Sequence, residues 1–170
     1  MREIREFGPM VEALRNLLWR RPRQARAPHL DLGDRGERAA LEYLEECEGY
    51  EIVATNFRVP LGRGLRGQKV TAEIDIIAYD GDTLAFIEVK TRVSSEMFAP
   101  EHAVDLRKQR QIARAARRYR NLMSVIEEPY RYDVVTVVPD GNKNRIELLR
   151  AYFDDSVFRR SGDYRRYDKW

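Results

Sequence analysis

The sequence has few of the residues on which disulfides and most transition-metal centres depend. It contains one cysteine, Cys47, and two histidines, His29 and His102, in 170 residues. A single cysteine excludes an internal disulfide and a multi-cysteine zinc site, and it fits a reducing compartment. Two histidines give a histidine-based metal site or a Ser-His-Asp triad little to draw on. We expect Cys47 to belong to the core and His102 to lie at a solvated helix start.

Long apolar runs are also absent. No stretch approaches the roughly 20 apolar residues of a membrane span, and the N-terminus lacks the apolar segment of a signal peptide. We therefore expect a cytoplasmic protein without a membrane partner. Charged residues of both signs are abundant, with 31 Lys and Arg against 28 Asp and Glu. The net charge of +3 is small, so only local clusters of one sign are informative.

The length fits one domain with a sizeable core. We divide the chain into a basic N-terminal extension at 1–30, a domain at 31–153 and a charged aromatic tail at 154–170. Periodic segments follow one another as helix, three strands, helix, strand and a further strand, which predicts an α/β or α+β fold with a mixed sheet. The predicted elements are a helix from an N-cap at Asp34 to Gly49, strands at 50–59 and on both sides of 80–83, a helix within 101–123, a buried strand at 130–139 and an edge strand at 145–153.

The segment Val70 to Arg92, VTAEIDIIAYDGDTLAFIEVKTR, carries the most chemistry. Its apolar runs flank a turn-forming cluster and predict a hairpin. Alternation places Glu73, Asp75 and Ile77 on one face of the first strand, opposite to Ile74, Ile76 and Ala78. On the second strand, Phe86, Glu88 and Lys90 share a face.

Two registers of this hairpin are open. A turn over Asp80 to Thr83 sets Asp75 opposite Glu88, whereas pairing of Tyr79 with Asp82 sets Glu73 opposite Glu88. Opposed carboxylates destabilise a sheet unless something compensates for their charge.

A divalent cation could supply that compensation. Mg²⁺ and Mn²⁺ prefer carboxylate and carbonyl oxygens, so Asp75, Glu88 and the Val89 carbonyl form a candidate ligand set. Lys90 would then hold the attacking water or stabilise the charged phosphate during phosphodiester hydrolysis. The competing interpretation is an exposed hairpin with a polar outer face.

Glu37 lies on the core-facing stripe of the first helix, with Ala40, Leu41 and Leu44. Two explanations are open for an acid at this position. In a capping box with Asp34, Glu37 would bond back to the N-cap amide. Alternatively, it would reach the carboxylates of the sheet as a further metal or water ligand.

Basic residues gather in two places. The 107–120 segment holds seven Lys or Arg and no acid, which favours a polyanionic partner over a merely solvated helix face. Its Lys108 falls on the same side as the apolar stripe and is expected to face inward. The Gly- and Arg-rich loop at 60–69 could close over a phosphate backbone or be a solvated hairpin tip. The predicted nucleic-acid-binding residues are Arg63, Arg66, Lys69, Arg92, Arg107, Lys108, Arg110, Arg114 and Arg117.

The motifs GDRGERAALEYL, TNFR, AEIDIIAYDGDTLAFIEVKTR and RYDVV, together with the helix that carries Lys108, resemble the YraN family of uncharacterised bacterial proteins. That family resembles archaeal Holliday junction resolvases and the PD-(D/E)XK nucleases. The resemblance implies a restriction-endonuclease-like α-β-β-β-α-β core. It implies that Glu37, Asp75, Glu88 and Lys90 occupy the nuclease positions, with Glu73, Thr91 and Lys108 at matching positions nearby.

We therefore expect a Mg²⁺- or Mn²⁺-dependent endonuclease that hydrolyses DNA, including branched or junction DNA. A homodimer would suit a four-way junction, because symmetric cleavage calls for symmetric active sites. The alternative is a non-catalytic module that binds nucleic acid on a nuclease fold within a DNA-processing complex. A metal-free RNA endonuclease is a weaker candidate, because such chemistry relies on histidine and both histidines lie outside the motifs.

Overall fold

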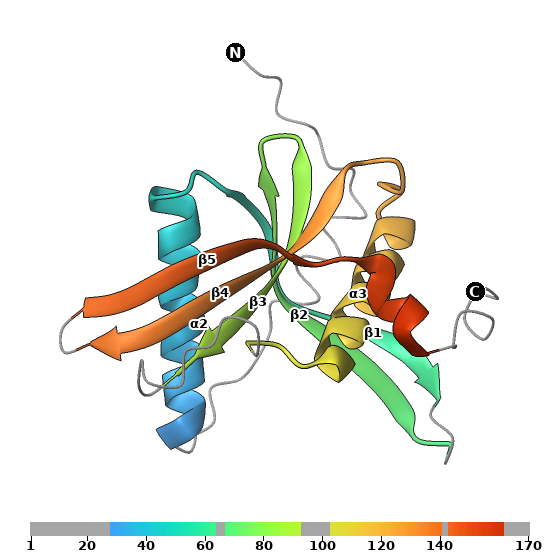
Figure 1. Cartoon of the computed structure of the whole chain (residues 1–170), viewed down its shortest axis with the longest axis horizontal. Helices are drawn as coiled ribbons and strands as arrows, with labels where there is room; N and C mark the ends of the chain where they lie inside the picture. Colours follow the sequence, from blue (N-terminus) through green and yellow to red (C-terminus); the bar gives the residue numbers. More distant parts are fainter. Residues whose placement is uncertain (1–27, 64–66, 93–102, 141–142, 162–170) are drawn as a thin grey trace.

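A twisted mixed sheet with a helix on each face forms the centre of the structure (Figure 1). This computed structural model describes residues 28–63, 67–92, 103–140 and 143–161. Within these ranges the strands lie in chain order, and neighbours are antiparallel except for the parallel pair β3 and β4. The elements are α2 (Pro28–Glu46), β1 (Glu51–Arg63), β2 (Lys69–Asp80), β3 (Thr83–Thr91), α3 (Leu106–Leu122), β4 (Tyr130–Asp140), β5 (Lys143–Phe153) and the 3-10 helix η3 (Asp155–Ser161).

The apolar side chains divide into two core clusters, one under each helix. Leu44 of α2 packs with Ile76, Ile87 and strand residues of the same face. On the other face, Ile112 and Tyr119 of α3 pack with residues that include Ile77 and Phe86. The predicted order α-β-β-β-α-β is confirmed, with the buried strand at 130–139 and the edge strand at 145–153. No helix in the described part of the chain is long and apolar enough to cross a membrane.

The hairpin of β2 and β3 adopts the first of the two registers. Asp80 pairs with Thr83, and the same offset continues to the pair of Ile76 with Ile87. Extended by one residue, this offset sets Asp75 opposite Glu88. The alternative with Glu73 opposite Glu88 is wrong, because the two-residue turn is formed by Gly81 and Asp82, one position later than that register requires.

Beyond Ile76 and Ile87 the two strands separate. In Figure 1, β1 and β2 continue to the lower right, while β3, β4 and β5 continue to the lower left. The sheet therefore forks, and we call the point where β2 leaves β3 the fork. Asp75 and Glu88 are the first residues past the last pair of the ladder, so both stand at the fork.

Strict alternation along β2 fails at this point. Ile74 and Ile77 belong to the same core cluster, although alternation predicts opposite faces for them. The reason is a kink in the strand pair. Asn56 of β1 has a φ of 52°, and the ladder passes from the pair Thr55–Ile76 directly to the pair Phe57–Ile74. Asn56 is thus left facing Asp75 across the kink.

The helix α2 begins earlier than its sequence pattern indicated. It starts at Pro28, where the missing N–H is tolerated in the first turn. Asp34 therefore lies inside the helix, and the predicted N-cap and capping box with Glu37 are wrong. The helix ends at Glu46, three residues before the predicted end at Gly49; Gly49 has a φ of 72°, and the chain then turns into β1. Cys47 follows the last helical turn and is exposed, so its predicted place in the core is also wrong.

β1 extends to Arg63, so much of the predicted loop at 60–69 belongs to a long hairpin with β2. At the other end of the domain, η3 follows β5 and packs on α3. Its Val157 is buried in the core, and the Val157 carbonyl accepts a hydrogen bond from Arg110 Nε at 2.9 Å. Residues 1–27 and 162–170, which hold most of the predicted extension and part of the tail, lie outside the described residues.

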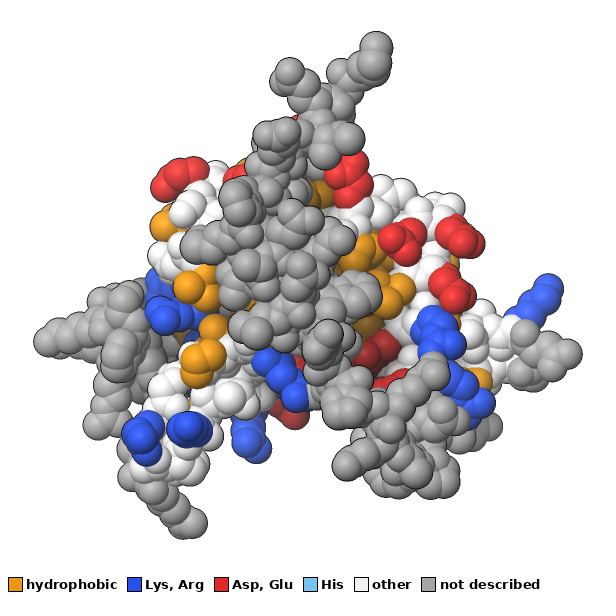
Figure 2. Space-filling model, turned by 180° about the vertical axis from the view of Figure 1, so that it is seen from behind, with side chains coloured by type: hydrophobic (Ala, Val, Ile, Leu, Met, Phe, Trp, Pro, Cys, Tyr) orange, Lys and Arg blue, Asp and Glu red, His pale blue; other side chains and the backbone are white. Residues whose placement is uncertain are grey.

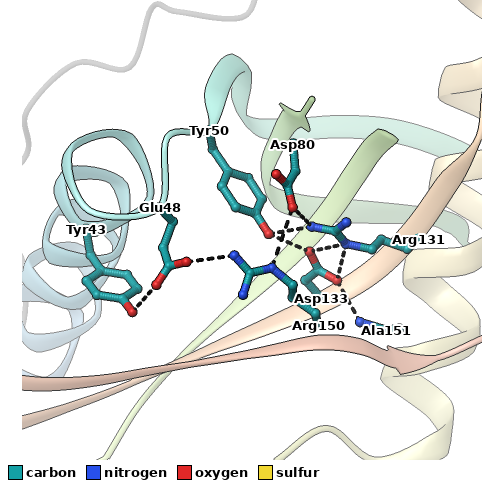
Figure 3. A network of polar contacts seen from close by, with 8 residues as sticks. All are labelled: Tyr43, Glu48, Tyr50, Asp80, Arg131, Asp133, Arg150 and Ala151. Atoms are coloured by element: carbon teal, nitrogen blue, oxygen red, sulfur yellow. Dashed lines mark hydrogen bonds and ion pairs between the residues drawn. The ribbon is translucent and has the colours of Figure 1, made fainter. Parts of the chain in front are cut away.

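A polar network holds the closed end of the β2–β3 hairpin (Figure 3). Asp133 of β4 is fully buried and accepts hydrogen bonds from Arg131 Nε, Tyr50 Oη and the Ala151 amide. Arg131 also pairs with Asp80 at the hairpin turn, at 2.5 Å. These contacts tie the turn to β4 and β5 and so help to fix the register that places Asp75 opposite Glu88.

Candidate active site

Asp75 and Glu88 enter the site because the fork interrupts the backbone ladder. The Val89 N–H donates to Asp75 Oδ2 at 2.8 Å instead of to the backbone of β2. A side chain thus replaces a strand as the hydrogen-bond partner. This bond fixes the Asp75 carboxylate against β3, beside Glu88.

Glu88 is a buried acid held by two lysines. Its side chain is 2% exposed. Lys90 Nζ donates to Oε1 at 2.7 Å from two residues along β3. Lys108 Nζ of α3 lies 2.9 Å from Oε2. This second contact is an ion pair without hydrogen-bond directionality, because Oε2 has no hydrogen-bond donor among the described residues.

The Asp75 carboxyl resists ionisation. Burial, followed by the negative charge of Glu88, raises its pKa to about 7. The Val89 amide and the Lys108 ammonium act in the opposite direction. Burial also disfavours the charge of Lys108, but Glu88 and Asp75 raise the pKa of Lys108 overall. The site therefore places two acids where they need a positive charge.

Glu37 approaches the same region from α2. Its carboxylate is half-buried and accepts a long hydrogen bond of 3.4 Å from Asn56 Nδ2, at the kink opposite Asp75. Burial raises the pKa of Glu37, and the charges of Glu73 and Glu88 contribute to this increase. Since Asp34 is not an N-cap, capping no longer explains an acid at position 37. The structure brings Glu37 to the β1–β2 side of the fork.

The close approach of α2 to β3 depends on Gly36. A Cβ at this position would lie 1.9 Å from Thr91 Oγ1, which is far inside contact distance. Gly36 therefore lets the helix rest directly on the end of β3, one residue before Glu37. Thr91, one residue after Lys90, is the other half of this contact.

The two central acids fit a divalent cation. Glu88 is buried and Asp75 is half-buried, and the mutual repulsion of these two carboxylates is a feature that a hard cation would relieve. Mg²⁺ in particular often binds through one or two carboxylates together with water and substrate phosphates. Within the described ranges, however, no three His, Cys, Asp or Glu side chains are grouped closely enough to hold a metal ion. Glu37 thus does not join Asp75 and Glu88 in a three-acid group.

The basic residues of α3 have three different environments. The predicted inward direction of Lys108 is confirmed by its ion pair with Glu88. Arg110 is half-buried and tied to the Val157 carbonyl, and Arg114 is half-buried as well. Arg107 and Arg117 are exposed. Only part of the basic run is therefore fully presented to solvent, while Lys108 ties α3 to β3 and Arg110 ties it to η3.

The remaining predicted nucleic-acid-binding residues lie on the β1–β2 hairpin and after β3. Arg63 and Lys69 are exposed and stand opposite each other on β1 and β2 near the hairpin tip. Arg66 lies outside the described residues. Arg92 is half-buried, and its amide donates to the Val137 carbonyl at 2.9 Å. On the face shown in Figure 2, acidic side chains lie recessed among Lys and Arg side chains in the lower half. Most of the other acidic side chains on this face lie in its upper half, so the face is not uniformly basic.

Asn56, Gly36 and Asp133 were not singled out from the sequence, although each helps to shape the site. Gly36 interrupts a helical pattern, and Asp133 is an acid at the start of an apolar strand, so both left a signal. The sequence signal for the left-handed backbone of Asn56 is weak: asparagine tolerates this conformation better than most residues.

Comparisons with known proteins give a consistent family. Residues 36–137 match UPF0102, described as an uncharacterised protein family. A UPF0102 protein of Koribacter versatilis is 41% identical over 74% of this chain and 80% of its own length. UPF0102 proteins of Desulfosudis oleivorans (42% identical, 74% of this chain, 91% of the relative) and Bacteroides thetaiotaomicron (38%, 78% and 99%) are also similar. Among solved structures, the crystal structure of SSO0001 matches with a TM-score of 0.40 and 18% identity, covering 81% of this chain and 60% of that one.

Proposed function

The chain belongs to the uncharacterised UPF0102 (YraN) family, and we propose that it is a Mg²⁺- or Mn²⁺-dependent endonuclease that hydrolyses phosphodiester bonds of DNA. The observation that carries this proposal is the fork. There two carboxylates from adjacent strands, one of them 2% exposed, meet beside two lysines. An ordinary polar sheet face does not bury acids of like charge in this way.

The residues at the fork have separate roles in the proposed reaction. Asp75 and Glu88, with the Val89 carbonyl, are the groups that would hold the cation. A bound cation would lower the pKa of a coordinated water and neutralise charge on the phosphate. Lys90 stands on the same side of β3 as Glu88 and supplies a fixed positive charge for the charge that develops on the phosphoryl group.

Glu37 is suited to orient the attacking water. It lies beside the two central acids without grouping with them, and burial raises its pKa. A half-buried carboxyl with a raised pKa is a better proton acceptor than a fully solvated one. Asn56 and Gly36 are positioning residues. Asn56 donates a hydrogen bond to the Glu37 carboxylate, and Gly36 lets α2 approach β3.

Exposed basic residues would bind the DNA backbone. Arg107 and Arg117 of α3 and Arg63 and Lys69 of the hairpin tip lie on elements that flank the fork. Contacts of this kind set position and affinity and carry no base specificity. They agree with a substrate recognised by shape, including branched DNA. A homodimer acting in the cytoplasm would supply the paired active sites that a four-way junction requires.

The test is cleavage of end-labelled single-stranded, duplex, flap and four-way-junction DNA. Reactions contain Mg²⁺, Mn²⁺ or EDTA, with the wild type and the Lys90→Ala variant. We expect cutting that requires both a divalent cation and Lys90, with the preferred shape identifying the substrate. Cutting that persists in EDTA or in Lys90→Ala would refute the assigned chemistry.

A second candidate, a nucleic-acid-binding module without cleavage, is favoured by one specific observation. Lysines already neutralise both oxygens of Glu88, so the fork is electrostatically satisfied to a large extent without any cation. In that case DNA binding would survive Glu88→Ala, Lys90→Ala and EDTA, and no substrate would be cut. DNA binding is measured as a function of salt concentration, because phosphate contacts make it salt-sensitive.

A further inference from the structure

The two lysines that hold Glu88 are not equivalent. Lys90 follows Glu88 by two residues on β3 and makes a directional hydrogen bond to Oε1. Lys108 reaches Oε2 from a different element, α3, and its contact lacks hydrogen-bond geometry. The bond to Oε1 is therefore part of the local strand structure, whereas the contact to Oε2 depends on one long, adaptable side chain.

Lys108 is also placed to move. It lies in the first turn of α3, where the Asp105 side chain fixes the backbone by accepting a hydrogen bond from the Lys108 amide at 2.8 Å. The Lys108 side chain is 29% exposed, so its ammonium has a route to water that does not require α3 to shift. The backbone is thus held while the charged end can leave Glu88.

A cation bound to Glu88 Oε2 and the Lys108 ammonium cannot share that oxygen. An ammonium 2.9 Å from Oε2 would face a divalent cation across a few ångströms in a region of low dielectric, where repulsion is strong. The nearby Asp75 carboxylate can balance only part of the three positive charges that the divalent cation and the ammonium carry together.

We infer that Lys108 acts as a resident cation, occupying the position beside Glu88 Oε2 that a divalent metal ion takes, so that metal binding and the Lys108–Glu88 ion pair exclude one another. This inference rests on the proposed metal-dependent function. In the metal-free protein the Lys108 ammonium neutralises part of the negative charge of Glu88 and Asp75. On metal binding the ammonium is released toward solvent next to the exposed Arg107, where substrate phosphates are expected.

The test compares Lys108→Met with Arg107→Met. Both variants replace a positively charged side chain in the same helical turn by an uncharged, unbranched one, but only the first removes the contact with Glu88. Calorimetric titration with Mn²⁺ at fixed ionic strength should show roughly tenfold tighter binding to Lys108→Met than to wild type, and a change of about twofold or less for Arg107→Met.

Thermal unfolding separates this role from a purely structural one. Lys108→Met should unfold at a lower temperature than wild type in EDTA, and Mn²⁺ should raise its unfolding temperature by more than it raises that of wild type. A structural role alone would lower stability with no added response to Mn²⁺.

A measurement on the wild type keeps the inference testable if Lys108→Met does not fold. Acetic anhydride labelling of Lys108, read by mass spectrometry, should increase severalfold on addition of Mg²⁺, while labelling of the exposed Lys143 stays constant.

Equal or weaker Mn²⁺ binding by Lys108→Met, with Mn²⁺ still bound by wild type, would overturn the inference and leave the proposed function standing. Unchanged Lys108 labelling in wild type that binds Mg²⁺ would do the same. Failure of both wild type and Lys108→Met to bind any divalent cation would overturn the inference together with the metal-dependent function.

Discussion

Replacing Asp75 by Asn should stabilise the metal-free protein, and the gain should depend on pH. Asn keeps the shape of the side chain and an oxygen that can accept the Val89 N–H. The pKa of Asp75 is raised from 3.8 to about 7, so ionisation of this acid opposes folding. At about 1.4 kcal/mol per pKa unit the ceiling is about 4 kcal/mol. We expect on the order of 2 kcal/mol, since solvent and Lys108 screen part of the charge.

The direction follows from proton linkage. An acid whose folded-state pKa is raised contributes stability below its unfolded pKa, and loses that contribution as the pH rises through its folded pKa. The advantage of Asp75→Asn should therefore be small near pH 4, grow up to about pH 7 and then level off. Urea unfolding in EDTA at a series of pH values measures it.

A matched control is Glu73→Gln, two residues earlier on β2. Glu73 forms a surface ion pair with Arg58 at 2.7 Å, and such pairs contribute about 0 to 1 kcal/mol. Its replacement should change stability little at any pH in this range. Loss of stability in Asp75→Asn above neutral pH, or a gain equal at all pH values, would refute the electrostatic reasoning.

Three further outcomes are expected. Gly36→Ala should lower the free energy of unfolding by about 2 kcal/mol or more, because the new Cβ would clash with Thr91 at the end of β3. In Gly33→Ala the new Cβ meets nothing within 4 Å, so this variant should raise the free energy of unfolding by up to about 1 kcal/mol. Urea titration measures both changes. Asp133→Ala should cost about 3 kcal/mol or more, because it removes the fully buried acceptor of three hydrogen bonds and a charge partner of Arg131. Glu48→Gln on the more exposed side of the same network should cost about 1 kcal/mol or less, and comparable losses would contradict the assigned burial. Arg117→Ala should leave the cleavage chemistry unchanged and should lower the slope of log Kd for DNA against log salt concentration by about one phosphate contact. An unaltered slope would show that Arg117 does not contact the DNA backbone.

The hairpin and its acids were predictable because local rules govern them. The turn residues at 80–83 allowed only two registers, and side-chain alternation near the turn was correct as far as Ile76 and Ile87. Farther from the turn the same rule failed, because the strand pair is kinked where Asn56 has a left-handed backbone and faces Asp75. A single left-handed residue shifts every later side chain, and its effect is not visible in a period-2 pattern.

The start of α2 was missed for a different reason. Asp34 is a good N-cap residue with an acid three positions later, and this pattern outweighed the weaker helix signal of Pro28. The error mattered, since it supplied a structural explanation for Glu37 that the helix does not permit.

Contacts between distant segments account for the rest. Lys108 was predicted to face inward, but nothing in its spacing identified Glu88 as its partner. In the same way Arg131 and Asp133 lie two residues apart in one strand, whereas their partners Tyr50 and Asp80 lie far away in the sequence. Such contacts form only when the sheet has assembled, and they control the charge balance of the site.

The most direct single measurement is the single-turnover rate of DNA cleavage in Mg²⁺ by wild type and by Glu88→Gln, on the substrate that wild type cuts best. Gln keeps the size of the side chain and removes the charge that binds a cation. We predict that cleavage by wild type is abolished in Glu88→Gln, while both proteins bind the DNA with similar affinity. Equal cleavage rates, or no cleavage by wild type of any DNA shape at any divalent-cation concentration, would contradict a nuclease site at the fork.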